Sequence, residues 1–213
     1  MSILSADDLI YGYMNGIFPM ADSDTTLYWY SPDPRAIIPI DTYQSPKSLR
    51  PVLNKKRFEV RINTNFEAVM RGCSAPRDDD EGTWISEEII GAYTKLHGMG
   101  FAHSVETYID NSLVGGLYGV SIGAAFFGES MFHRVSDASK VAFHYLIEIL
   151  RQQQFELLDT QFLNDNVRRF GAIEISKSEY IRRLKKAVDK RVKFTGGSVD
   201  QLLKIDTGVV NQR

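Results

Sequence analysis

Few features of the common functional classes occur in this sequence. Its 213 residues include a single cysteine, Cys73, which excludes an internal disulfide and a cysteine-based metal cluster and fits a reducing compartment. No apolar run approaches the length of a membrane span, and the first residues lack the basic and apolar regions of a secretory signal. We therefore expect a cytoplasmic protein that has no membrane partner.

A strong net charge is also missing. The chain has 25 lysines and arginines against 27 acidic residues, a net charge of −2, so any contact with nucleic acid must come from a local basic patch. Three successive aspartates follow Arg77, but consecutive carboxylates point apart and lack the spacing of a calcium loop. We expect no metal and no other cofactor.

Motifs of nucleotide and hydrolase chemistry are absent as well. The glycines at 115, 116 and 119 lie in a predicted strand with no helix after it, unlike a dinucleotide-binding loop. The Gly-x-Ser-x-Gly motif that would suggest a Ser/His hydrolase does not occur in the sequence. The second half has no glycine-rich loop leading into a helix, which an acyl-CoA-dependent N-acetyltransferase needs for pyrophosphate. That acetyltransferase is kept as an alternative.

Two apolar segments stand out because polar groups interrupt them. Residues 126–132 place Glu129 among aromatic residues, where burial is costly unless the carboxylate has partners. Residues 157–165 contain Asp159 and Gln161, which project from the same face of an ideal strand. A carboxylate beside a carboxamide can orient a polar substrate. The alternative is a buried polar network that only stabilises the fold.

The order of predicted elements indicates an α+β fold. Helices are expected after the capping residues Ser5, Ser86, Ser136 and Ser176. Strands are expected at 36–40, 58–62, 103–109, 113–120, 124–132, 155–162 and 172–175, with the glycines near 115–119 marking a bulge. This order predicts an antiparallel meander, a long helix and then a central strand, which is an acyltransferase layout.

Six sequence blocks, in order along the chain, carry a resemblance to a known family. They are residues 16–19, 29–35, 81–85, 114–120, 126–132 and 157–165. Together they resemble the leucyl/phenylalanyl-tRNA–protein transferase family from about Asp7 to about Leu184. The resemblance implies a GNAT-like acyltransferase domain at 61–194 behind a small N-terminal lobe at 1–60. The chain begins late relative to many members, so a truncated lobe is expected, and the tail at 195–213 is expected to be partly disordered.

The activity implied by this resemblance is transfer of leucine or phenylalanine, and also of methionine, from aminoacyl-tRNA. The acceptors are proteins with N-terminal arginine or lysine, which are thereby marked for degradation under the N-end rule. The aminoacyl ester is already activated, so ATP, metal and CoA are not required. A monomer is expected. A non-catalytic tRNA-binding module, which would bind RNA without turnover, is a second alternative.

The resemblance also implies roles for the polar residues. Asp159 would orient the acceptor amine or the cationic side chain of the acceptor. Gln161 would accept a hydrogen bond from the amine, and Glu129 would bind the aminoacyl-adenosine end or the acceptor. Asn164 would support the end of the strand. A carboxamide is a very weak base, so positional catalysis is expected, with the ribose hydroxyl of the tRNA relaying the proton.

Two further groups of residues are predicted to bind substrate. An apolar pocket for the donor side chain is assigned to Trp84, Leu117, Phe126 and Met131, for which ordinary core packing is the alternative. The tRNA phosphates are assigned to the basic cluster of the first half, for which a solvated surface is the alternative. That cluster consists of Lys47, Arg50, Lys55, Lys56 and Arg57.

Overall fold

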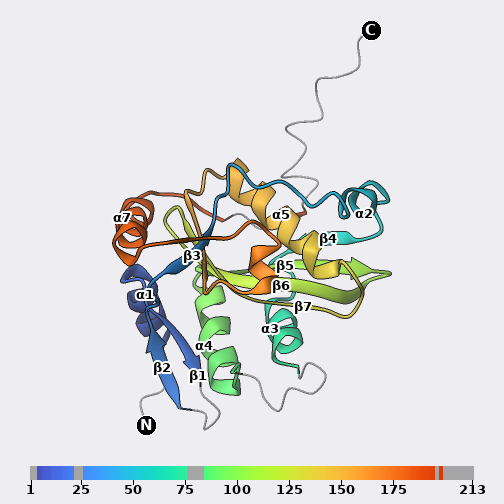
Figure 1. Ribbon diagram of the computed structural model, residues 1–213. Helices are drawn as coiled ribbons and strands as arrows, with labels where there is room; N and C mark the ends of the chain where they lie inside the picture. The colour runs from blue at the N-terminus through green and yellow to red at the C-terminus, as the bar shows by residue number, and fades with distance from the viewer. Residues whose placement is uncertain (1–3, 22–25, 76–83, 195–196, 199–213) are drawn as a thin grey trace.

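The computed structural model describes residues 4–21, 26–75, 84–194 and 197–198 of the chain (Figure 1). The three successive aspartates and nearly all of the predicted tail lie outside these residues, so the expectations about them stand as predictions. Among the described residues, no helix combines the length and apolar character that crossing a membrane requires.

A mixed eight-stranded sheet forms the centre of the molecule, in the order β10-β4-β5-β6-β7-β8-β3-β9. The strands β4 to β7 pair antiparallel in sequence order, which confirms the predicted meander. Strand β8 lies inside the sheet, as predicted, and pairs parallel with β7. The strands are β3 (Arg35–Ile38), β4 (Glu59–Ile62), β5 (Ala102–Ile109), β6 (Ser112–Ile122), β7 (Ala125–His133), β8 (Leu157–Gln161), β9 (Ile173–Ile175) and β10 (Gly197–Ser198).

Helices cover both faces of this sheet. Helix α5 (Ala138–Gln152) and the short α2 (Arg50–Asn54) pack on one face, here called the α5 face. The opposite face is covered by α1 (Ala6–Met14), α3 (Phe66–Ser74), α4 (Glu87–Gly98) and α7 (Lys177–Val188). Short α6 (Asp165–Arg168) follows β8. The hydroxyls of Ser5, Ser86 and Ser176 accept backbone N–H groups of α1, α4 and α7, which confirms these predicted caps.

The N-terminal segment contributes to both parts of the molecule. A separate two-stranded sheet, β1 (Phe18–Ala21) with β2 (Leu27–Tyr30), packs beside α1. Strand β3 instead lies within the main sheet, between β8 and β9, although the sequence assigned residues 1–60 to a lobe. Its apolar residues Ala36, Ile37 and Ile38 are buried, which favours an interior strand over a surface lobe.

The contact between β7 and β8 is short. The strands pair only from Ala125 opposite Leu157 to Phe127 opposite Asp159, after which no partners are paired and the strands separate. On its other side, β7 has a bulge at this point, because Gly119 pairs with Gly128 and Tyr118 pairs with Ser130. Glu129 is the extra residue of the bulge. This bulge turns a carboxylate toward the gap in the sheet. The bulge predicted within the glycine-containing strand is a separate one, at Val114 of β6, because Thr107 pairs with Gly115 and Tyr108 pairs with Leu113.

Candidate active site

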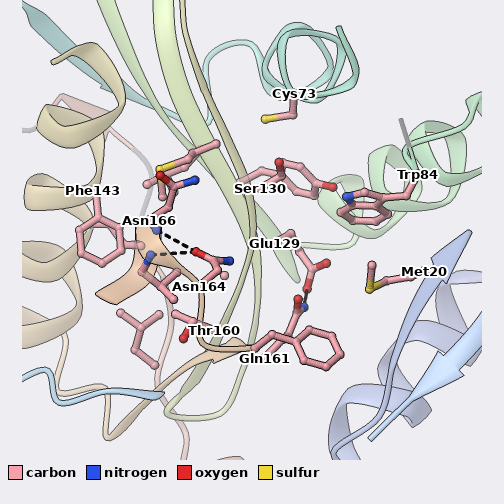
Figure 2. A pocket seen from close by; sticks show the side chains of 18 of the residues that line it. Met20, Cys73, Trp84, Glu129, Ser130, Phe143, Thr160, Gln161, Asn164 and Asn166 are labelled. Atoms are coloured by element: carbon pink, nitrogen blue, oxygen red, sulfur yellow. Dashed lines mark hydrogen bonds between the residues drawn. The ribbon is translucent and has the colours of Figure 1, made fainter. Parts of the chain in front are cut away.

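A cavity of about 330 Å³ lies where β7 and β8 separate (Figure 2). Its walls come from both strands, from the N-terminal hairpin and from α3, α5 and α6. The lining residues used below are Met20, Trp84, Leu117, Glu129, Met131, Phe143, Leu146, Leu158, Thr160, Gln161 and Asn164. The cavity thus occupies a gap within the sheet and is lined by residues from both of its faces.

The end of the cavity on the α5 face is apolar. Leu117 and Met131 are register partners on β6 and β7, and both pack with the hydrophobic cluster beneath α5. Phe143 and Leu146, one turn apart on α5, close this end together with Leu158. This end offers a desolvated space for an apolar side chain.

The opposite end carries the polar groups, which are built around Glu129 beside the apolar side chains of Met20 and Trp84 (Figure 2). Its Oε1 accepts the hydroxyl of Tyr13 at 2.7 Å and the Nε2 of Gln161 at 2.9 Å. Its Oε2 lies 3.5 Å from the hydroxyl of Tyr93, which itself pairs with Tyr13. Burial raises the pKa of Glu129 to about 8, against the opposing effect of the Tyr13 hydrogen bond. This carboxyl group therefore gains or loses a proton near neutral pH.

Gln161 has an unusual backbone conformation for its position. It ends β8 with φ of 65°, in the left-handed region that a residue with a side chain seldom adopts. Its backbone N–H donates to Oδ1 of Asp159 at 2.8 Å, which holds this conformation. Its side chain lines the cavity, its Nε2 donates to Glu129, and no hydrogen bond from a described residue reaches its Oε1. Gln161 thus presents a free acceptor to a bound substrate.

Asp159 has a different environment from the one expected. The residue is fully buried, and it forms a two-pronged ion pair with Arg35, with Nε–Oδ1 at 2.9 Å and Nη2–Oδ2 at 2.6 Å. Oδ2 also accepts the hydroxyl of Tyr180 at 2.7 Å, and Oδ1 accepts the N–H of Gln161. A direct contact between Asp159 and an acceptor amine, as the sequence predicted, does not fit this geometry. Asp159 instead positions Gln161.

Arg35 is held as firmly as its partner. Only 1% of Arg35 is exposed, and its guanidinium carbon lies 4.7 Å from the ring centre of Phe18 and 4.5 Å from that of Tyr180. Nη1 donates to the backbone oxygen of Gly16 at 3.2 Å. The Arg35–Asp159 pair therefore connects β3 and β8 with the segment after α1 and with α7.

The predicted pocket residues separate into two groups. Trp84, Leu117 and Met131 line the cavity. Phe126 does not: it is fully buried in the core, where its ring lies 5.4 Å from that of Phe194, so its assignment to the pocket is corrected. Phe126 precedes the point at which the strands separate, whereas Met131 follows it.

The remaining predicted residues lie at the rim or outside the cavity. Asn164 lines it and caps α6, where its Oδ1 accepts the N–H groups of Asn166 at 3.0 Å and Val167 at 3.1 Å. The basic residues of the first half lie on and around α2, are all exposed, and do not line the cavity. These are Lys47, Arg50, Lys55, Lys56 and Arg57. Within the described part of the chain, no group of three or more His, Cys, Asp and Glu residues could hold a metal ion.

Comparison with known proteins gives the family. The sequence profile named leucyl/phenylalanyl-tRNA protein transferase matches residues 37–185, and the profile of that family's N-terminal domain matches residues 3–33. The chain belongs to the leucyl/phenylalanyl-tRNA protein transferase family. It is 48% identical to the transferase of this name from Chlorobaculum tepidum over 193 residues, which cover 90% of this chain and all of that protein. The relative from Gloeobacter violaceus is 50% identical over 192 residues, covering 90% and 97%.

Similarity to solved structures is more distant. L-PGS from Bacillus licheniformis superposes on this transferase with a TM-score of 0.46 at 10% identity, covering 88% of this chain and 93% of that one.

Four residues of the site were missed in the sequence: Tyr13, Arg35, Tyr93 and Tyr180. Arg35 had a detectable signal, because a cation that directly precedes a buried apolar strand requires a partner. Its partner lies 124 residues away, and no spacing rule connects them. Each tyrosine fits the apolar stripe of its helix, so nothing in the sequence distinguishes it from ordinary core.

Proposed function

We propose that this transferase moves leucine or phenylalanine from aminoacyl-tRNA to the N-terminal amine of a protein that begins with arginine or lysine. The observation that carries the proposal is the cavity in the sheet, in which an apolar end adjoins a polar end with a free acceptor on Gln161. The apolar end suits the donor side chain. Because a hydrophobic pocket discriminates weakly between similar side chains, methionine is also expected as a donor.

The reaction requires positioning more than activation. The neutral amine attacks the carbonyl carbon of the ester, the bond to the ribose oxygen breaks, and that oxygen takes the proton which the amine loses, relayed by the neighbouring ribose hydroxyl. Oε1 of Gln161 accepts a hydrogen bond from the amine and aims its lone pair. Gln161 is itself held by Asp159 through its backbone. Both residues thus bind or orient, and neither forms a covalent bond to the substrate.

Glu129 suits the cationic acceptor. Burial keeps its pKa near 8, and the approach of an arginine or lysine side chain would favour the ionised form. The hydroxyls of Tyr13 and Tyr93 would then hold the carboxylate in place. Thr160 lines the same cavity, and its buried hydroxyl lacks a hydrogen-bond partner among the described residues. A bound substrate would supply that partner.

The wider expectations from the sequence complete this proposal. The catalytic part is a GNAT-like domain, the protein acts as a cytoplasmic monomer, and its products enter N-end-rule degradation. The exposed basic residues at α2, from Lys47 to Arg57, contact tRNA phosphates.

Transfer of labelled leucine from charged tRNA to a peptide that begins with arginine tests the proposal. The matched control is the same peptide beginning with alanine, and a parallel reaction contains acetyl-CoA in place of tRNA. Label should appear on the arginine peptide alone. Binding of charged tRNA without transfer would favour the non-catalytic alternative, and acetylation of the peptide would favour the acetyltransferase.

A further inference from the structure

The last described helix and the residues after it carry an unusual concentration of positive charge. Residues 177–193 hold eight of the 25 lysines and arginines but only two of the 27 acids, a net charge of +6 in a chain of net charge −2. All eight cations are exposed. They are Lys177, Arg182, Arg183, Lys185, Lys186, Lys190, Arg191 and Lys193. The rest of the chain is correspondingly acidic, so this surface has the sign that attracts a polyanion.

The pairing of these cations leaves positive charge unbalanced. Glu179 bridges both Arg182 and Arg183, and these bonds lower its pKa to about 2. Glu156 in the same way serves both Lys186 and Lys190. Each carboxylate is thus shared by two cations. Exposed ion pairs of this kind are weak, so the basic side chains can leave these carboxylates and bind a polyanion at little cost in free energy.

A groove accompanies the charged helix. About 520 Å³ of space lies between α7 and the C-terminal end of α5, and its lining includes Arg182, Arg183 and Lys186. Arg151 on α5 also lines it, but its guanidinium is engaged by backbone oxygens of Ile40 and Tyr43 and forms part of the scaffold. The α7 cations therefore supply the side chains that can move to a ligand.

We propose that the basic face of α7 and its adjoining groove bind the phosphate backbone of the tRNA body, apart from the aminoacyl end. With 12 residues, α7 is about 18 Å long, enough to follow several phosphates of one strand of a duplex. Figure 1 places α7 and α2 on opposite sides of α5, so tRNA would be held at two separate basic surfaces. This inference rests on the proposed function.

The buried face of α7 is the one that contacts the site, so tRNA contacts on the exposed face need not disturb the chemistry. Tyr180, Leu184 and Ala187 are buried against the sheet, and Tyr180 bonds to Asp159. Arg183 and Lys186 point away from this buried stripe. Replacing them should leave the Asp159–Gln161 arrangement unchanged.

The test compares two double variants of the full chain. Arg183→Gln with Lys186→Gln removes two α7 cations, and Arg71→Gln with Lys95→Gln is the matched control on α3 and α4. Arg71 suits this purpose because, like Arg183, it is exposed and pairs with a glutamate four residues before it. The α7 variant should bind leucyl-tRNA on the order of tenfold more weakly. Its log–log salt slope should flatten by about 0.7–0.9 per lost phosphate contact. The control should match wild type.

A short donor separates RNA contact from a structural effect. Both variants and wild type should transfer leucine from an aminoacylated CCA trinucleotide equally well, because that donor has no stem. Equal affinity and salt slope for full tRNA in wild type and the α7 variant would overturn the inference, as would an equal loss with the short donor. If wild type itself transfers no leucine, the proposed function fails. A flattened salt slope in the α7 variant would still establish the RNA contact.

Discussion

The carboxylate of Asp159 accepts the backbone N–H of Gln161 at 2.8 Å, and Gln161 adopts a left-handed backbone conformation at this contact. The two residues therefore have different roles: Asp159 holds Gln161, and Gln161 faces the substrate. Asp159 is anchored to Arg35 and Tyr180 and fixes the backbone, while the carboxamide of Gln161 reaches Glu129 and the cavity. This relationship leads to separate predictions for the two positions.

Replacing Gln161 should impair turnover without weakening the fold. Gln161→Ala should lower the single-turnover rate at saturating tRNA on the order of 10²-fold, because the amine loses its aligned acceptor. Gln161→Gly should lose the same activity yet be at least as stable as wild type, since glycine adopts a positive φ freely. Thermal unfolding and single-turnover transfer are measured on the same samples. Wild-type turnover in either variant would remove Gln161 from the reaction.

Replacing Asp159 should act first on stability. Asp159→Asn leaves the buried Arg35 charge without its counterion, which should lower the free energy of unfolding by about 3–5 kcal/mol. Adding Arg35→Met removes that unpaired charge, so the double variant should regain much of the loss. Urea unfolding gives the free energy of unfolding of the Asp159→Asn variant, the Arg35→Met variant and the double variant. If the two substitutions are simply additive, the ion pair does not hold β3 and β8 together as described.

The raised pKa of Glu129 predicts a pH dependence of stability. A carboxyl group with a pKa of about 8 in the folded state and an ordinary value of 4.5 holds its proton more tightly when folded. Its contribution is therefore full below about pH 4.5 and is lost as the pH rises through 8, by at most about 1.4 kcal/mol per pH unit.

Glu129→Gln is the variant that isolates this effect. Its stability should fall less than that of wild type between pH 5 and pH 8, because the neutral amide cannot ionise. The neighbouring Tyr13 and Tyr93 do not titrate in this window, since burial raises the pKa of each well above 10. Parallel pH profiles of urea unfolding for the two proteins would contradict the assignment.

The basic cluster at α2 should contribute to tRNA affinity and not to chemistry. Changing Lys55, Lys56 and Arg57 to alanine should weaken binding of leucyl-tRNA and flatten its salt dependence by up to about 0.9 log units per lost phosphate contact. The rate at saturating tRNA should stay near wild type, because these residues do not line the cavity. An unchanged salt slope would identify the cluster as a solvated surface.

Local patterns account for much of the fold and for part of the site. Capping residues such as Ser5 and Ser176, and the alternation of β5 to β7, are encoded within a few neighbours and were predictable. The sequence also suggested one face for Asp159 and Gln161, but strand periodicity assumes an extended backbone, so it could not show the left-handed conformation of Gln161 or its backbone contact with Asp159. Arg35 and the tyrosines join the site through contacts between distant segments, which a single sequence does not contain.

The separation of β7 from β8 divides the cavity between two faces of one sheet, with apolar side chains under α5 and the polar centre on the other side. Residues such as Phe143 and Leu146 can change in size without touching Glu129 or Gln161. On the proposed function, the preference for the transferred group can therefore change during evolution while Glu129 and Gln161 stay the same. The same independence makes the α5 wall the natural place to engineer transfer of unnatural amino acids.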